Sequence, residues 1–91
     1  MANYEVRIKE SAAKELRDLP LKDKSRIIAR IRGLSTDPRP MGSEKLSGDE
    51  KYRLRQGDYR ILYSIEDGSK FVTIVRIGHR RDVYRSQGQR G

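Results

Sequence analysis

The chain has 91 residues, 34% apolar and 37% charged, which limits it to one small domain with a modest core whose stability is marginal or supported by a partner. Lysine and arginine number 21 against 13 acidic residues, and the resulting net charge of +8 favours a polyanion such as nucleic acid as a partner. The absence of cysteine excludes disulfides and cysteine-based zinc sites or nucleophiles, and no apolar run reaches the length of a signal peptide or a membrane span, so we expect a soluble, cytoplasmic protein with no membrane partner.

The first half of the chain predicts one strand and two helices. Residues 4–9 alternate apolar and charged side chains, which is the pattern of a half-buried strand. Ser11 is a candidate N-cap for a short helix that ends at Pro20, because proline cannot continue the helical hydrogen bonds. From Leu21 to Leu34 apolar residues recur at helical spacing, so a second helix completes a helical hairpin.

The second half predicts a three-strand meander. Residues 35–49 contain two prolines and two glycines and are expected to form a loop. Side chains alternate over residues 52–55, turn residues follow at 56–58, and a second extended segment covers residues 59–65. After another turn, residues 71–77 are mostly β-branched or aromatic and predict the third strand.

Together these elements predict an α+β fold in a single domain at residues 1–85, followed by a disordered tail at 86–91. The sheet is expected to be small, twisted and mainly antiparallel, and to combine the N-terminal strand with the C-terminal meander. The helical hairpin packs on one face of the sheet. The other face stays free, and a functional site is expected there.

Arginines on the first strand of the meander form one candidate site. Alternation along the strand puts Arg53 and Arg55 on the face opposite Leu54, about 7 Å apart. Arg60 joins them if the following turn has the right register. Guanidinium groups match phosphate oxygens bidentately and stabilise the charge that grows during phosphoryl transfer. Alternatively, these arginines only solvate an exposed sheet face or contact acidic residues of a partner protein.

The end of the last strand is a second candidate site. It contains His79, Arg80, Arg81, Tyr84 and Arg85 within a few residues of one another. Cleavage of RNA by its own 2′-hydroxyl needs a group that takes this proton, a group that protonates the leaving 5′-oxygen, and cations around the phosphate, and it needs no metal. Tyr84 is a candidate base because neighbouring arginines favour its phenolate form, and His79 is the alternative. Each of the two could instead have only a packing or surface role.

Two segments resemble the RelE and ParE superfamily of bacterial and archaeal toxins, specifically its RelE-like ribonuclease branch. They are YRLRQGDYRILY at 52–63 and IGHRRDVYR at 77–85, and the similarity extends over nearly the whole chain. The resemblance implies the fold described above and cleavage of messenger RNA in the decoding site of the ribosome. It also implies no cofactor, metal or small-molecule ligand, and a cognate antitoxin protein that covers the basic face of the toxin.

The resemblance also implies roles for individual residues. The catalytic positions are Arg53, Arg55, Arg60, Arg80 and Tyr84, together with His79, and the RNA-binding positions are Lys51, Arg53, Arg55, Arg60, Arg81 and Arg85. RelE-like enzymes often have lysines at the positions of Arg53 and Arg55. Arginine keeps the charge, but with a pKa above about 12 it is a poor proton donor, so the resemblance does not extend to acid catalysis by these two residues.

Two other functions stay open. The ParE-like branch implies a non-enzymatic poison of DNA gyrase. A third hypothesis is an RNA- or ribosome-binding module that has the fold without the chemistry, because a fold does not fix a function. The phenol of Tyr84 near Arg80 favours the nuclease, since a pure binding module needs the charges but no phenol beside them.

Overall fold

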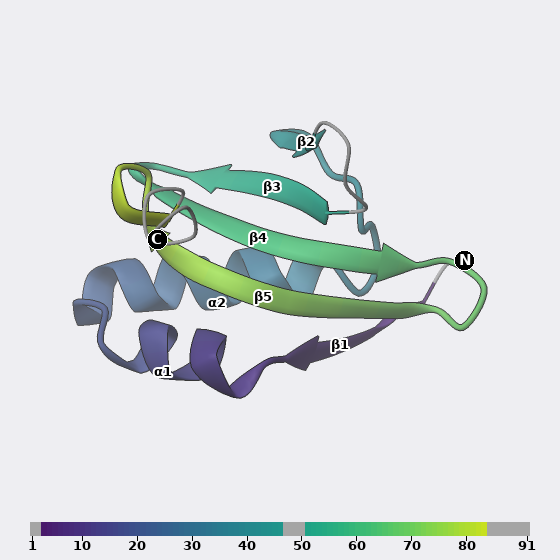
Figure 1. Cartoon of the computed structure of the whole chain (residues 1–91), viewed down its shortest axis with the longest axis horizontal. Coiled ribbons are helices and arrows are strands. Elements are labelled where there is room, and N and C mark those ends of the chain that lie inside the picture. Colours follow the sequence, from purple (N-terminus) through teal and green to yellow (C-terminus); the bar gives the residue numbers. More distant parts are fainter. Residues whose placement is uncertain (1–2, 47–50, 84–91) are drawn as a thin grey trace, which may run out of the picture.

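The computed structural model describes residues 3–46 and 51–83, which form two helices and five strands (Figure 1). In chain order the elements are β1 (Glu5–Ile8), α1 (Glu10–Arg17), α2 (Leu21–Gly33), β2 (Ser43–Lys45), β3 (Lys51–Gln56), β4 (Tyr59–Glu66) and β5 (Phe71–His79). Neither α1 nor α2 is long and apolar enough to cross a membrane. Tyr84, Arg85 and the tail expected at 86–91 lie outside the described residues.

The strands form one sheet in the order β1-β5-β4-β3-β2. Strand β1 is parallel to β5, and all other neighbours are antiparallel. This arrangement confirms the predicted α+β fold, in which the N-terminal strand joins the edge of a C-terminal meander. Beyond the end of β1, α1 packs along β5, and the Glu15 carboxylate accepts a hydrogen bond from the backbone N–H of Ile77 at 2.9 Å.

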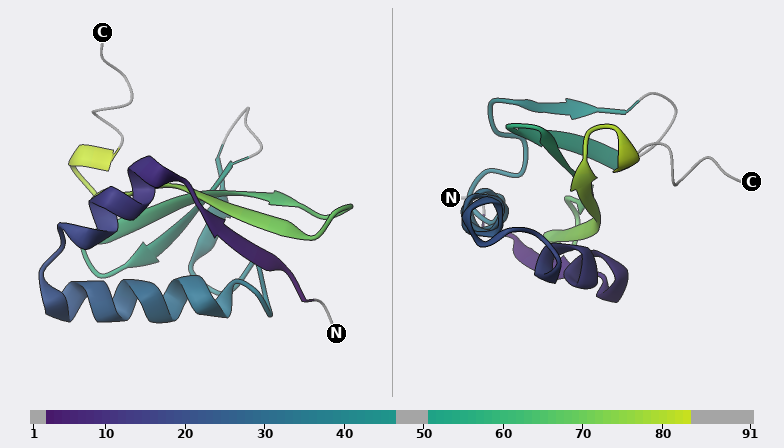
Figure 2. Two further views of the ribbon diagram at one scale, coloured as in Figure 1. Left: turned by 90° about the horizontal axis from the view of Figure 1, so that it is seen from below. Right: turned by 90° about the vertical axis from the view of Figure 1, so that its left-hand side faces the viewer.

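The hydrophobic core lies between one face of the sheet and the helices, chiefly α2, which lies along that face (Figure 2). Its buried residues are Ala12, Ile27, Ile31, Leu34, Leu54, Ile61, Tyr63, Val72, Ile74 and Ile77. Leu21, which belongs to the predicted apolar series of the second helix, is 76% exposed. It is the first residue of α2 and lies nearly two turns ahead of the first core residue of that helix.

Two local predictions were wrong. Ser11 is not an N-cap, because α1 begins before it with Lys9 as the capping residue. The chain enters this helix directly from β1, and the backbone N–H of Lys9 still donates to the carbonyl of Ile74 at 3.0 Å. The loop expected at residues 35–49 contains the short strand β2, which pairs with β3 and covers its edge.

Candidate functional site

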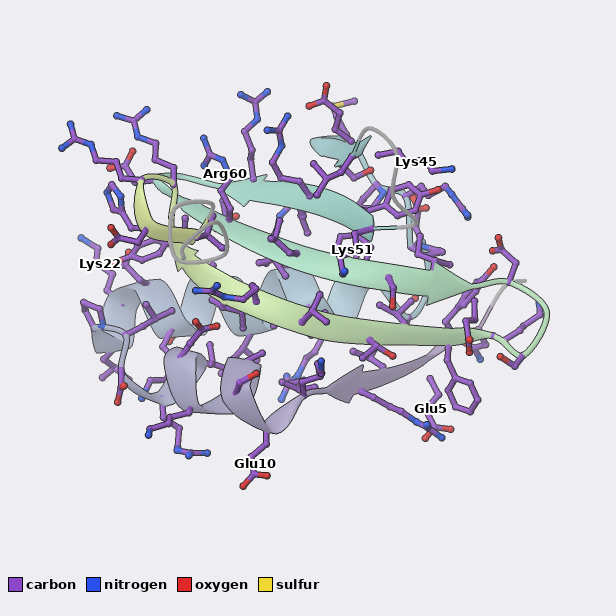
Figure 3. All side chains as sticks on the ribbon, in the orientation of Figure 1. Glu5, Glu10, Lys22, Lys45, Lys51 and Arg60 are labelled. Atoms are coloured by element: carbon purple, nitrogen blue, oxygen red, sulfur yellow. The ribbon has the colours of Figure 1, made fainter. Side chains whose placement is uncertain are left out.

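The β3–β4 hairpin aligns three arginines on the sheet face opposite the core. Gly57 begins its two-residue loop with a φ of 59°, which is typical of a type II′ turn. This loop fixes the register in which Arg55 lies directly opposite Arg60. Arg53 lies two residues earlier on β3 and therefore on the same face. The structure thus brings together Arg53, Arg55 and Arg60, which we call the arginine row; Figure 3 shows Arg60 near the hairpin end.

The guanidinium groups of the arginine row differ in their partners. Arg53 forms an ion pair with Glu44 of β2. Arg60 donates hydrogen bonds to two backbone carbonyls of the hairpin at 2.9 and 3.0 Å, which hold its side chain over the loop. Arg55 is exposed, and its guanidinium group has no hydrogen bond or ion pair with any described residue. Of the three, Arg55 is the most available to an external anion.

After β5 the chain folds back onto the face of the arginine row. Gly78 lies opposite Arg60, and a Cβ atom at position 78 would lie 3.7 Å from the Cβ of Val83. Val83 is fully buried, at 0% exposure, which fixes the end of the described chain on this face. Tyr84 follows Val83 directly in the sequence and lies outside the described residues.

Arg80 and Arg81 lie in the turn after β5, near the hairpin end of the sheet. The backbone N–H of Arg80 donates to the carbonyl of Asp58 at 2.8 Å, and its Nε lies 3.9 Å from the carboxylate of the same residue. Arg81 is exposed, and its backbone N–H donates to Nδ1 of His79 at 3.2 Å. Both arginines extend the basic surface beyond the last strand.

His79 lies on the face of the sheet opposite the arginine row. Its ring packs edge-on against Tyr59, with 5.9 Å between ring centroids, and both rings border a cleft of about 310 Å³ at the start of α2. Burial and then the nearby Asp23 raise the pKa of Tyr59. Of the predicted cluster at the end of the last strand, His79 thus lies on the face away from the arginine row, and Arg80 and Arg81 lie in the turn after β5. Within residues 3–46 and 51–83, no three His, Cys, Asp or Glu side chains are grouped as metal ligands.

A second cleft, which we call the basic cleft, opens on the face of the arginine row beside the start of α1. It measures about 220 Å³ and is lined by Lys9, Ser11, Lys51, Leu62, Val75 and Arg76. The pairing of β4 with β5 shifts by one residue here, so Val75 has no partner on β4 and lines the cleft together with Arg76. Lys51, one of the predicted RNA-binding residues, borders this cleft. The sequence has no specific signal for the bulge, because the adjacent apolar pair Ile74 and Val75 has a counterpart in Phe71 and Val72, where the pairing is regular.

Hydrogen bonds tie β3 and β4 to the loop that precedes β2. The Tyr63 hydroxyl donates to the carbonyl of Pro38 at 2.7 Å, and burial raises the pKa of Tyr63 to about 12. Arg39 donates to the hydroxyl of Tyr52 at 3.1 Å and pairs with Asp67 at 2.9 Å. The hydrogen bond from Arg39 lowers the pKa of Asp67. These contacts hold β3, and with it the arginine row, in place on the core.

Known toxins match this chain over most of its length. Residues 6–84 match the family model described as the ParE toxin of the type II toxin-antitoxin system parDE. Toxin RelG of Mycobacterium tuberculosis is 35% identical over 86 residues, which cover 90% of this chain and 97% of RelG.

Two solved structures share the fold. The toxin-antitoxin complex RelBE2 from Mycobacterium tuberculosis contains a chain with a TM-score of 0.76 and 30% identity, over 86% of this chain and 99% of that one. The archaeal RelE–RelB complex from Pyrococcus horikoshii gives a TM-score of 0.77 and 31% identity, over 88% of this chain and 97% of the matched one. The chain belongs to the RelE/ParE superfamily of toxins of type II toxin-antitoxin systems.

Proposed function

We propose that this toxin is a ribosome-dependent endoribonuclease that cleaves messenger RNA in the cytoplasm without a metal cofactor. The observation that supports this most strongly is the arginine row, in which three guanidinium groups share one face and Arg55 has no anionic partner within the described part of the chain. Such a group of planar donors on a rigid sheet suits a phosphodiester. The resemblance to RelE-like ribonucleases points to the same activity.

In the proposed reaction, the 2′-oxygen of one nucleotide attacks the adjacent phosphorus atom. A bond forms between phosphorus and the 2′-oxygen, the bond to the 5′-oxygen breaks, and the products are a 2′,3′-cyclic phosphate and a 5′-hydroxyl. Negative charge grows on the phosphate oxygens, and Arg53, Arg55 and Arg60 stabilise it. Arg80 adds positive charge at the hairpin end.

Proton transfer is assigned to groups other than these arginines, because a guanidinium group with a pKa above about 12 holds its protons too tightly. Tyr84 takes the proton of the 2′-hydroxyl, and the leaving 5′-oxygen takes one from water. His79 borders the cleft on the other face of the sheet, and we assign it no part in this step.

We further infer a cognate antitoxin as the protein partner. Related toxins have been solved in complexes with RelB antitoxins. A net charge of +8 favours an antitoxin with acidic residues, and a core of this size would gain stability from such a partner by mass action. An antitoxin that covers the arginine row would block access of RNA to it.

Messenger cleavage in a translating extract tests this proposal. We expect the unmodified chain to cut messenger RNA, and Arg55→Gln and Tyr84→Phe to lower the rate by about 10²–10³ each. Arg32→Gln is the matched control, since Arg32 is exposed near the end of α2 and belongs to neither cleft. An intact messenger with the unmodified chain would contradict the enzyme assignment, and full cleavage by the two variants would contradict the assigned roles.

Poisoning of DNA gyrase is the second candidate function, and the match of residues 6–84 to a family model named for ParE favours it. It predicts inhibited supercoiling by purified gyrase while messenger RNA stays intact. A binding module without chemistry predicts neither effect, and its expression would leave growth unchanged.

A further inference from the structure

We propose that the basic cleft binds a nucleotide of the RNA strand that flanks the scissile phosphate, an inference that rests on the proposed nuclease function. The cleft and the arginine row share one sheet face, because Lys51, Arg53 and Arg55 alternate along β3 with core-facing residues. Arg55 lies four positions after Lys51 along β3, which corresponds to about 13 Å. A single RNA strand whose scissile phosphate sits on the arginine row can therefore reach the cleft with a neighbouring nucleotide.

The bottom of the basic cleft is apolar. Leu62 is 1% exposed, and the bulge in β5 puts Val75 and Arg76 together on the same face as Leu62. Bulges re-aim side chains in this way and are common next to functional sites. Two aliphatic side chains at the bottom of a small cleft suit the face of a nucleobase or a ribose, which has little charge of its own.

The walls of the basic cleft are cationic. Lys9, Lys51 and Arg76 line it, and none of its lining residues within 3–46 and 51–83 is acidic. The Lys9 side chain is exposed and has no hydrogen bond or ion pair within the described part of the chain, so its charge is available to a phosphate. Arg76 is fixed by an ion pair with Glu15 at 3.0 Å, which reduces its net charge but holds its guanidinium plane in position.

The cleft at the start of α2 has the opposite character. Its lining includes the carboxylates of Asp23 and Asp58 with Arg26 as the single strong cation, which does not favour a phosphate. Of these two clefts, only the basic cleft combines an apolar floor with a cation, Lys9, that has no ion pair within the described part of the chain. Ser11 adds a hydroxyl group at its rim that makes no hydrogen bond with another described residue.

The length dependence of RNA binding tests this assignment. The purified full chain is titrated with 2′-O-methyl RNA, which cannot be cleaved by its own 2′-oxygen, as a dinucleotide and as a hexanucleotide, with fluorescence anisotropy as the readout. We expect the longer RNA to bind more tightly. Lys9→Gln should reduce that gain. For the hexanucleotide only, it should also make the negative slope of log binding constant against log salt concentration shallower by about 0.7.

Two further variants separate binding from folding. Ser11→Glu places an acidic residue in the first turn of α1, where it stabilises the helix, yet it should repel phosphate and weaken binding of the hexanucleotide. Lys22→Gln makes the same change in net charge as Lys9→Gln, on a residue near the start of α2 (Figure 3) that is not among the lining residues of either cleft. This variant should bind both lengths as the unmodified chain does.

The inference is overturned if the unmodified chain gains nothing from the longer RNA, or if Lys9→Gln and Ser11→Glu keep the whole gain. Messenger cleavage by the same preparations reports on the proposed function separately. Cleavage without a length-dependent gain removes the nucleotide site alone. A gain that both variants lose, in the absence of any cleavage, supports the site and removes the nuclease.

Discussion

Arg55 and Arg60 lie directly opposite each other on the antiparallel strands β3 and β4. Like charges in this position destabilise a sheet, and no described acidic residue neutralises Arg55. The pair therefore costs stability in the free protein and becomes favourable when an anion lies between the two guanidinium groups. The proposed phosphate site at the arginine row requires such a relationship.

Replacing Arg55 with glutamine should separate stability from activity. Removal of the like-charge pair is expected to raise the free energy of unfolding by about 0.2–1 kcal/mol at low salt, as measured by urea denaturation. Messenger cleavage by the same variant should fall. Arg32→Gln should neither raise the free energy of unfolding nor lower messenger cleavage. If Arg55→Gln instead loses both stability and activity, Arg55 has a structural role.

Gly78 should tolerate a small side chain but not a branched one. A Cβ atom at this position meets Val83 at 3.7 Å, an ordinary contact, so Gly78→Ala should keep both fold and activity. Gly78→Val adds atoms where Val83 sits and should displace the segment after β5 from the sheet. We expect messenger cleavage to fall more than thermal stability does, and an active Gly78→Val variant would contradict the importance of this contact.

The Glu15 carboxylate should contribute to stability through two partners. It accepts the backbone N–H of Ile77 and pairs with Arg76, so Glu15→Ala leaves a buried donor without an acceptor. The expected loss is about 1–3 kcal/mol in urea unfolding. Glu15→Gln keeps an acceptor for Ile77 and should lose less; equal losses for the two variants would argue against this hydrogen bond.

Tyr63 should make stability fall at alkaline pH. Its pKa in the folded chain is about 12 against an ordinary value of 10.0, because burial disfavours the phenolate. The contribution of Tyr63 to the free energy of unfolding is therefore fully present below pH 10. It falls progressively as the pH rises from 10 to 12, because the unfolded chain ionises first. Tyr63→Phe loses the hydrogen bond to Pro38, at a cost of about 1 kcal/mol near neutral pH, but it also loses this titration.

The difference in unfolding free energy between Tyr63→Phe and the unmodified chain should therefore shrink between pH 10 and 12. Urea denaturation at a series of pH values measures it. The other tyrosines titrate in both proteins and cancel in the comparison. A difference that stays constant across this range would mean that the Tyr63 phenol is not protected from water.

Local patterns in the sequence predicted the helices and strands, because an element that buries one of its faces in the core has apolar residues at regular spacing. Alternation around Leu54 was enough to put Arg53 and Arg55 on the open face. The face on which Arg60 lies cannot be predicted from alternation alone, since it depends on the number of residues in the hairpin loop. Gly57 and Asp58 form a two-residue loop, and this turn settles the register.

Other features of the site depend on pairing between strands and could not be predicted from local patterns. The prediction treated the segment after Ile77 as one cluster, whereas β5 continues through His79 and alternation sends this ring to the face opposite the arginine row. The bulge at Val75 exists only in relation to β4, and the basic cleft forms only because α1 starts beside it. Strand β2 is short and follows two prolines, so its pairing with β3 had no local signal.

The most direct test of the central claim is the chemistry of the cut ends. Messenger RNA on programmed ribosomes is incubated with the purified chain, and the new ends are mapped. Attack by the 2′-oxygen on a phosphate held at the arginine row predicts a 2′,3′-cyclic phosphate and a 5′-hydroxyl, both strongly reduced with Arg55→Gln. Intact messenger RNA, or ends with a 5′-phosphate, would contradict the account.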